Sequence, residues 1–434
     1  MATTKKDPVL VVLQLTGGND YFNTVIPYTD PRYRDYRPYV GIPDEQILKL
    51  DDTLGLHPSA APFQDLYNEG KMAIIHGVGW PNSPRSHFRA MDIWHTCEPD
   101  KNGEEGWLGR AIRELDPTKE NVATGINFGY DLPRALTAPG VPVACVVDLE
   151  TYGLMPGISE EAQRAKVLDR FRRMYAPALG SGMVDDYVGQ TGLDAMKGAD
   201  ILKMAPLQYT SSVEYADSPI AKKLKGIAQV MSAELGTRIY YAAHGSFDTH
   251  TNELVNHALL WDQLSKAVEC FWDDVQRQGK GDETVIWMFS EFGRRIADNG
   301  TGTDHGSGGL AFMIGDSVNG GLYGDYPKLD LSEQLEGDVH FNTDFRQVYS
   351  TLLEDVLGIE SEPEELWKIP SDKLHAAGKP GAPQGFKRAM LNAGVDIMGG
   401  RGFIVSAVHT EKDVDRTLLA FEECLTKMRR DDLV

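Results

Sequence analysis

The sequence has little cysteine, and the cysteines it has are scattered. Cys97, Cys145, Cys270 and Cys424 form no CxxC pair, which argues against a thiolate zinc site and against a disulfide framework. Thiols spaced in this way suit a protein of a reducing compartment. We therefore predict a cytoplasmic location.

Long apolar runs are missing as well. No stretch approaches the ~18 apolar residues of a transmembrane helix. Two lysines precede the first apolar run, residues 9–15, but this run is too short for the core of a secretory signal, and no small-residue cleavage site follows it. The sequence thus predicts no membrane partner.

Positive charge is in deficit, with 43 Lys and Arg against 64 Asp and Glu and a formal charge of −21. A nucleic-acid-binding surface needs a basic face, so we expect no nucleic-acid partner. A small anionic substrate is still compatible with this charge, because a bound metal ion inverts the local field. The GxGxxG and GxxxxGK[ST] signatures of nucleotide binding are also absent.

What the sequence does contain is an alternation of short apolar runs with helical patterns. Turn residues bound the runs, which cover residues 9–15, 72–78, 141–149, 238–243, 284–290 and 310–314. Apolar residues at three- and four-residue steps predict a long helix from about Asn252 to Val275. The alternation predicts an α/β fold, with a mostly parallel central sheet and helices on both faces. Ligands of such sheets bind beyond the carboxyl ends of the strands.

The chain is predicted to divide near residue 375. Residues 1–375 form the main domain, within which about 99–235 are richer in loops and polar helices and are interpreted as an insertion or cap. The Gly- and Pro-rich residues 376–385 are the predicted linker, and 386–434 a small helix–strand–helix appendage. Its last helix has an apolar stripe that must be buried on the core or in a homo-oligomer contact.

Polar residues follow the first two predicted strands directly. Asp20 comes after Gly17-Gly18 at the end of the first strand, either as a metal ligand or as a helix cap. After the second strand, Ser83, Arg85, Ser86 and His87 fall within about one turn, at a predicted helix N-terminus that favours anions. A serine there is either a nucleophile activated by a metal or base, or a simple helix cap beside a solvated arginine.

A third group of residues comes from three further strand ends. The segments are HGSFDTH (residues 244–250), SEFGR (290–294) and TDHG (303–306). Carboxylates and neutral imidazoles that converge from separate segments are what a divalent metal site needs. A single histidine is more often structural, but the set favours a metal site.

Five of these motifs, in order, carry a resemblance to a known family: LQLTGGNDYFNTVIPY, SPRSHFRAMDIW, HGSFDTH, FSEFGRR and GTDHGSGG, over about residues 8–360. They resemble a bacterial domain-of-unknown-function family that is grouped with the alkaline phosphatase and sulfatase superfamily. The resemblance implies an alkaline-phosphatase-like α/β sandwich. It also implies metal-assisted hydrolysis of phosphate-like or sulfate-like esters, with a small anionic ester as substrate.

The same resemblance implies roles for individual residues. One or two divalent ions (Zn, Mn, Mg or Ca) are expected on Asp20, Asp248, His250, Glu291 and His305. Ser86 is the implied nucleophile, with Ser83 as its rival, and His87 follows in the same turn. Arg85 or Arg294 would steady the anion.

This sequence also departs from the superfamily pattern. Phe292 stands where the superfamily usually has a metal-binding histidine, and Glu291 where it usually has aspartate. Two alternatives therefore stay open: a metal-binding or carrier protein that has lost hydrolysis, and a phosphomutase or transferase.

The tail has a different likeness. Residues 394–425 resemble the C-terminal end of class III pyridoxal-phosphate aminotransferases. This piece has neither the Schiff-base lysine nor the phosphate cup of those enzymes, so no such cofactor is predicted.

Overall fold

The computed structural model describes residues 7–149, 152, 160–175 and 183–359, and these belong to one compact unit, residues 1–361. The predicted linker and appendage, residues 376–434, lie outside the described residues, so the predicted boundary near residue 375 stays a prediction.

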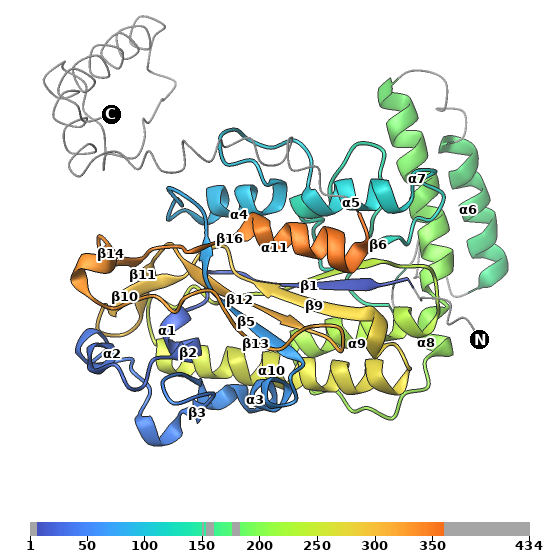
Figure 1. Cartoon of the computed structure of the whole chain (residues 1–434). Helices are drawn as coiled ribbons and strands as arrows, with labels where there is room; N and C mark the ends of the chain where they lie inside the picture. Colours follow the sequence, from blue (N-terminus) through green and yellow to red (C-terminus); the bar gives the residue numbers. More distant parts are fainter. Residues whose placement is uncertain (1–6, 150–151, 153–159, 176–182, 360–434) are drawn as a thin grey trace, which may run out of the picture. The chain divides into compact units, whose positions relative to one another are not determined.

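A nine-stranded sheet forms the centre of the described residues (Figure 1). Its strands are β1 (Val9–Leu15), β5 (Met72–Gly79), β6 (Gly125–Phe128), β7 (Ala144–Val146), β8 (Ile239–His244), β9 (Thr284–Phe289), β12 (Gly309–Ile314), β13 (Gly321–Tyr323) and β16 (Thr343–Asp344). Their order is β13-β5-β12-β9-β1-β8-β6-β7, with β16 also on β5. Only β12 runs antiparallel to its neighbours in this sheet. The predicted mostly parallel sheet is thus confirmed, and each predicted run overlaps one of its strands.

Helices cover both faces of the sheet, as predicted. In Figure 1, α4 (His87–Thr96), α5 (Trp107–Leu115) and α11 (Phe345–Thr351) lie above it. Below it lie α3 (Ala61–Asn68), α9 (Pro219–Ser232) and α10 (Glu253–Arg277). The remaining described helices are α1 (Tyr21–Thr24), α2 (Pro31–Tyr36), α6 (Glu161–Tyr175), α7 (Met183–Leu202) and α8 (Ala205–Gln208). None of the helices in the described ranges is long and apolar enough to cross a bilayer.

The long helix predicted from about residue 252 is α10. It begins after Asn252, whose backbone is left-handed. Its apolar stripe, which includes Trp261, Leu264, Val268 and Phe271, is buried in the core. Burial of one continuous stripe explains why the periodicity of this helix is so clear in the sequence.

The stretch interpreted as an insertion or cap, residues 99–235, contributes to the sheet itself. It contains β6 and β7, and β6 pairs in parallel with β8. It also contains α9, which packs against α10 below the sheet. The boundaries of this stretch as a separate part stay a prediction.

The short strands outside the central sheet are mostly hairpins. They are β2 (Val25–Ile26), β3 (Leu48–Lys49), β4 (Gly55–Leu56), β10 (Arg294–Asp298), β11 (Thr303–His305), β14 (Gln334–Leu335) and β15 (Asp338–Val339). The antiparallel pair β10–β11 follows β9 directly. It therefore returns the chain to the edge where the parallel strands end.

The register of the central strands brings their carboxyl ends together. Leu15 of β1 is paired with His244 of β8, and Gln14 of β1 with Phe289 of β9. The loop after β1 approaches the loop after β8 so closely that a Cβ on Gly17 would lie 2.3 Å from the backbone nitrogen of Asp248. Gly17 also has a φ of +122°, which favours glycine. This edge of the sheet is therefore where side chains from distant segments meet.

Candidate metal centre

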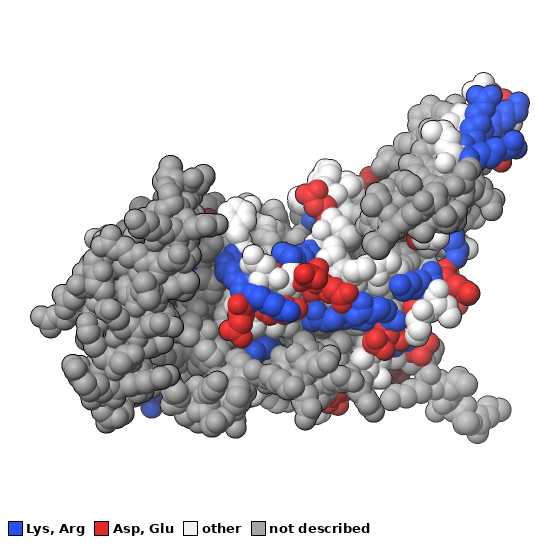
Figure 2. Space-filling model, turned by 90° about the horizontal axis from the view of Figure 1, so that it is seen from above, with Lys and Arg blue, Asp and Glu red and all other residues white. Residues whose placement is uncertain are grey.

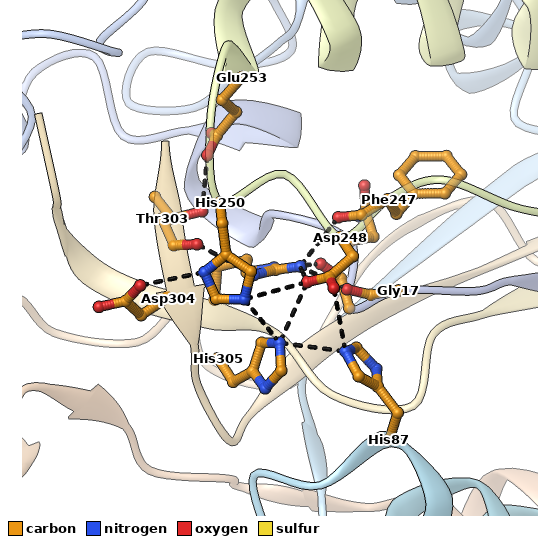
Figure 3. Close-up of polar contacts among 12 residues, drawn as sticks. Gly17, His87, Phe247, Asp248, His250, Glu253, Thr303, Asp304 and His305 are labelled. Carbon is orange, nitrogen blue, oxygen red and sulfur yellow. Dashed lines mark hydrogen bonds and ion pairs between the residues drawn. The ribbon is translucent and has the colours of Figure 1, made fainter. Parts of the chain in front are cut away.

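Four segments supply the side chains that meet at this edge, and Figure 3 shows those of His87, Asp248, His250 and His305. His87 begins α4, the helix after β5. Asp248 and His250 lie in the loop after β8, and Glu291 follows β9. His305 ends β11. Parallel strands place these segments side by side although up to 218 residues separate them.

Three of these residues form a compact group of possible ligands. One atom each of His87, Asp248 and His305 lies within 4.8 Å of the other two. The Nε2 atoms of His87 and His305 are 3.0 Å apart. The Oδ1 of Asp248 lies 3.0 Å from Nε2 of His305, and its Oδ2 lies 3.5 Å from Nε2 of His87. Two nitrogens and a carboxylate thus face one small volume.

His250 joins the group from the exposed side. Its Nε2 lies 2.9 Å from Nε2 of His305 and 3.2 Å from Oδ1 of Asp248. Its side chain is 42% exposed, so this imidazole faces both the group and solvent. A third ring nitrogen therefore borders the group, through His305 and Asp248, although His250 lies outside the compact set of three.

The other nitrogen of each imidazole, Nδ1, faces an oxygen atom that can accept a hydrogen bond. Nδ1 of His87 lies 2.8 Å from Oε1 of Glu291, and Nδ1 of His250 lies 3.0 Å from Oδ1 of Asp304. Nδ1 of His305 lies 3.0 Å from the carbonyl oxygen of Arg85. In the tautomer that carries its proton on Nδ1, each ring donates outward and presents the lone pair of Nε2 inward. Histidines that bind metals in proteins are usually oriented in this way.

This donor set fits a divalent cation. The three inward lone pairs lie beside one carboxylate. No single hydrogen-bond donor among the described residues could serve all three. A cation accepts them together, and imidazole nitrogens with a carboxylate suit Zn²⁺ or Mn²⁺. His87, Asp248, His250 and His305 would hold it.

Glu291 acts behind this group. Its side chain is buried, and its Oε1 accepts hydrogen bonds from the backbone N–H of Gly17 at 2.9 Å and from His87. The structure thus places this predicted ligand at the outer nitrogen of His87. Its contact fixes the orientation of that imidazole.

The charges at the site are set by these neighbours. Burial raises the pKa of Asp248, but the neighbouring guanidinium of Arg294 outweighs it and holds that pKa at about 2. The hydrogen bond that His87 donates to the carboxylate of Glu291 raises the pKa of His87 above its usual value. Asp248 is therefore an anion at neutral pH, and a positive charge on or beside His87 is favoured.

Arg294 lies beneath the group and ties three loops together. It is fully buried and donates to the carbonyl oxygens of Gly18 at 2.8 Å, Gly17 at 2.6 Å, Thr303 at 2.9 Å and Phe247 at 3.1 Å. It also forms an ion pair with Asp248. Arg294, which was predicted to steady the anion, thus lies where it holds the segments around the site in position.

Asp20 is not brought to the group. It is fully buried, and both of its carboxylate oxygens accept from the guanidinium of Arg37, with Nη2 2.8 Å from Oδ1. Burial raises the pKa of Asp20, but Arg37 outweighs it and holds that pKa at about 2. The structure places this predicted metal ligand in a buried ion pair.

The residues before α4 are divided between the site and its surroundings. Arg85 pairs with buried Asp338, with Nε 2.7 Å from Oδ2, while its carbonyl holds His305. Ser86 is exposed and precedes α4 without a capping hydrogen bond from its side chain. Ser83 is buried, and its hydroxyl has no hydrogen-bond partner among the described residues. His244, grouped with the site in sequence, is buried apart from it and donates to the carbonyl of Leu260 at 3.2 Å.

An open cleft of about 530 Å³ adjoins the group. The lining residues are Gln14, Thr16, Gly17, His87, Phe88, Met91, Asp92, His95, Arg134, Asp248 and Glu291. Sequence reasoning missed Gln14, Thr16, Phe88, Met91, Asp92, His95 and Arg134. Part of the signal was present, because His87, Met91 and His95 recur every four residues and so share one face of a helix.

The outer surface near the cleft carries charges of both signs. Figure 2 views the molecule from the side of α4 and α5, and its described part shows Lys and Arg interleaved with Asp and Glu. Asp92 pairs with both Arg89 and Arg134, and Arg113 pairs with Glu105.

The chain belongs to the family described as "Protein of unknown function (DUF1501)", whose model matches residues 7–359. This confirms that the chain belongs to a domain-of-unknown-function family, as predicted. None of the curated proteins matches the chain. The aminotransferase likeness of the tail lies outside both this match and the described residues, and no comparison supports it.

Several solved structures are similar to this chain at low identity and low TM-score. One is Ps i-CgsB, with a TM-score of 0.37, 9% identity, and coverage of 83% of this chain and 74% of that one. A putative sulfatase from Bacteroides thetaiotaomicron has a TM-score of 0.34 and 10% identity, with coverage of 83% and 73%. A protein of the alkaline phosphatase superfamily from Vibrio parahaemolyticus has a TM-score of 0.31 and 10% identity, with coverage of 73% and 62%. The function is therefore argued from the site itself.

Proposed function

We propose that this protein is a divalent-metal-dependent hydrolase of phosphate-like or sulfate-like esters. The observation that carries the proposal is the orientation of three imidazoles, whose Nε2 atoms converge beside Asp248 while each Nδ1 is held by an outer acceptor. A divalent cation at such a place polarises an ester oxygen and lowers the pKa of a hydroxyl or water. His87, Asp248, His250 and His305 bind it.

The other residues of the site orient and charge this group. Glu291 and Asp304 fix the rings of His87 and His250. Arg294 sets the distance between the loops after β1 and β8. Its positive charge offsets part of the repulsion between an anionic ester and a chain of charge −21.

Two hydroxyls are candidates for the nucleophile. Ser86 is the one predicted from the sequence, and it lies at the N-terminus of α4 immediately before His87, where an alkoxide is favoured electrostatically. Thr16 lines the cleft together with His87 and Asp248. We retain Ser86 as the predicted nucleophile and test Thr16 beside it.

A second candidate function is metal binding or transport without hydrolysis. Phe292 supports it, because its ring centroid lies 4.9 Å from that of His87 and 5.0 Å from that of His305. A non-coordinating ring therefore fills the space beside two of the ligands. Only one group of three possible ligands occurs in the described part of the chain, which supports one ion rather than two.

Elemental analysis of the purified protein, followed by ester turnover with added Zn²⁺ or Mn²⁺, tests the proposal. We expect one bound ion per chain, turnover of aryl phosphates or sulfates, and loss of both in His305→Ala. His340→Ala is the matched control, because His340 is exposed and outside the group. Absence of bound metal in the wild type contradicts the proposal, and bound metal without turnover across a broad panel favours the carrier.

Comparison of Ser86→Ala with Thr16→Val identifies the nucleophile. The true nucleophile variant loses about 10³-fold or more in kcat and keeps its metal, since covalent catalysis is removed but the ligands are not. A product formed by transfer to an added alcohol, instead of water, would favour the transferase alternative. The cytoplasmic location and the small anionic substrate stay predictions.

A further inference from the structure

Helix α4 presents one of its faces to the cleft along its whole length. His87, Phe88, Met91, Asp92 and His95 all line the cleft, and their spacing of one, three and four residues places them on successive turns of one face. His87 is also a member of the candidate ligand group. The cleft thus continues from the metal centre along α4, at about 5.4 Å for each helical turn.

The surface that α4 offers beside the metal centre is apolar. Phe88 is 92% exposed, although a phenyl ring gains nothing for folding when it stays in water. Met91, one turn further along, is half-buried and lies next to it on the same face. Single exposed apolar residues are common on proteins, but these two are neighbours inside a cleft that also holds charged ligand residues.

The polar side chains of the cleft are already engaged with one another. Oε1 of Gln14 lies 2.9 Å from Nε2 of His95 and also accepts from the hydroxyl of Tyr241. Nη1 of Arg134 donates to Asp92 at 2.6 Å. These pairings reduce what the cleft can offer to the many hydroxyls of a sugar, because each such hydroxyl needs its own partner when it leaves water.

We propose that the cleft is a binding site for the organic part of the ester, and that this part is an apolar group of about the size of one ring, held against Phe88 and Met91. A volume of about 530 Å³ lies within the range of small-molecule sites and exceeds what a phosphate or sulfate group alone needs. The anionic end faces His87 and Asp248. The orientation of the ester rests on the proposed function, whereas the apolar preference rests on the cleft alone.

Binding of two non-hydrolysable probes to the full chain tests this inference without turnover. Phenylphosphonate and methylphosphonate carry the same anion and differ in the apolar group, and isothermal titration in saturating Zn²⁺ gives the Kd of each. We expect phenylphosphonate to bind about tenfold more tightly, as the burial of one aromatic ring against another allows. In Phe88→Ala this preference falls to about twofold or less, and in Phe88→Leu it is partly restored.

Tyr39→Ala is the matched control, because Tyr39 is an aromatic residue that is 68% exposed and does not line the cleft. It should keep the full preference. Equal binding of the two phosphonates by the wild type, or no binding of either, overturns the inference. A preserved preference in Phe88→Ala and Met91→Ala also overturns it.

The outcome separates this inference from the proposed hydrolase. A phenyl preference without turnover of any ester keeps the apolar site and rejects hydrolysis. Turnover without a phenyl preference supports hydrolysis and rejects the apolar site.

Discussion

At the scale of single residues, the two nitrogens of each imidazole have different tasks. The inner Nε2 atoms converge, and the outer Nδ1 atoms are held by Glu291, Asp304 and the carbonyl of Arg85. Such outer partners typically contribute a factor of about 10–100 to metal affinity, because they fix the ring and its tautomer. Asp304 is the best place to measure this contribution, since its side chain is 55% exposed and contributes little to the buried core.

Asp304→Ala is therefore expected to weaken metal binding by about 10–100-fold while the protein keeps its fold. Competition against a chelating dye gives the affinity, and circular dichroism reports the fold. Glu45→Ala, which removes another exposed carboxylate outside the site, serves as control. An Asp304→Ala affinity within twofold of the wild type would show that Asp304 does not orient His250.

A second residue-scale prediction concerns the buried charges behind the site. Asp20, Arg37 and Glu253 are all buried, and one guanidinium serves two carboxyl groups. Burial and the charge of Asp20 raise the pKa of Glu253 well above its usual value. Glu253 therefore favours its protonated form more than a free carboxyl group does, whereas Asp20 favours its ionised form.

Asp20→Asn should cost about 3–5 kcal/mol of the free energy of unfolding, because it leaves Arg37 charged without its partner. Glu253→Gln should cost much less, because glutamine resembles the protonated form. The folded state binds the proton of Glu253 more tightly than the unfolded chain, so this group's stabilisation is complete below pH 4.5 and is lost as pH rises. Urea unfolding at several pH values should thus show the wild type losing its advantage over Glu253→Gln towards alkaline pH. An equal loss of the free energy of unfolding in Asp20→Asn and Glu253→Gln would contradict the assignment of the proton to Glu253.

The sequence could show which acidic and histidine residues lie near the ends of strands, but it could not show which residues they contact. Asp248 and His250 follow one apolar run and His305 precedes another, and the structure brings the three together. Asp20 follows such a run too, yet it pairs with Arg37, which lies in a polar stretch with no periodic pattern. Only the packing of α2 against β10, where Arg37 donates to the carbonyl of Ile296 at 2.9 Å, decides that pairing.

At the scale of secondary-structure elements, the site depends on loops that Arg294 holds in place. This residue begins β10 and donates to carbonyl oxygens after β1, after β8 and in β11. A lysine has three donors on one atom and cannot reach the same acceptors as a planar guanidinium. The positions of Asp248 and His305 should therefore depend on the arginine.

Arg294→Lys is expected to lower the free energy of unfolding by about 2–4 kcal/mol, since buried carbonyls and Asp248 lose their partners, and to weaken metal binding as well. Chemical denaturation and metal titration measure the two effects. Arg277→Lys on the exposed side of α10, where the arginine is 57% exposed, should change neither. Normal metal affinity in Arg294→Lys would mean that the loops keep their positions without this arginine.

The elements of the central sheet could be predicted because buried parallel strands read as continuous apolar runs. β1 is buried at all seven positions and matches its predicted range. The predicted strand at 141–149 shortens to β7, Ala144–Val146, and Pro142 before it cannot donate to a ladder. β11 was not predicted as a strand, because its three residues are mostly polar and serve the site.

At the scale of the whole molecule, the tail is predicted to mediate assembly. The apolar stripe predicted between residues 414 and 428 lies outside the described residues, and a homo-oligomer formed through it stays a prediction. Light scattering after size exclusion should give a dimer or larger for the full chain and a monomer for a chain that ends at Ser361, the end of the compact unit. Equal oligomeric states would exclude the tail as the contact.

The metal centre should also stabilise the whole molecule, because its ligands come from segments as distant as His87 and His305 and the unfolded chain cannot assemble them. A cation present at about 100 times its Kd adds about 2.7 kcal/mol to the free energy of unfolding. For a compact unit that spans residues 1–361, that corresponds to roughly 3–4 °C in the thermal midpoint. Calorimetry with and without EDTA should show this decrease, and added Zn²⁺ or Mn²⁺ should reverse it. His305→Ala should melt at the same temperature under all these conditions, because it lacks the imidazole that both His87 and His250 face. A wild type that is indifferent to EDTA and to added metal would mean that the four side chains meet for a purely structural reason, with protons in place of a cation.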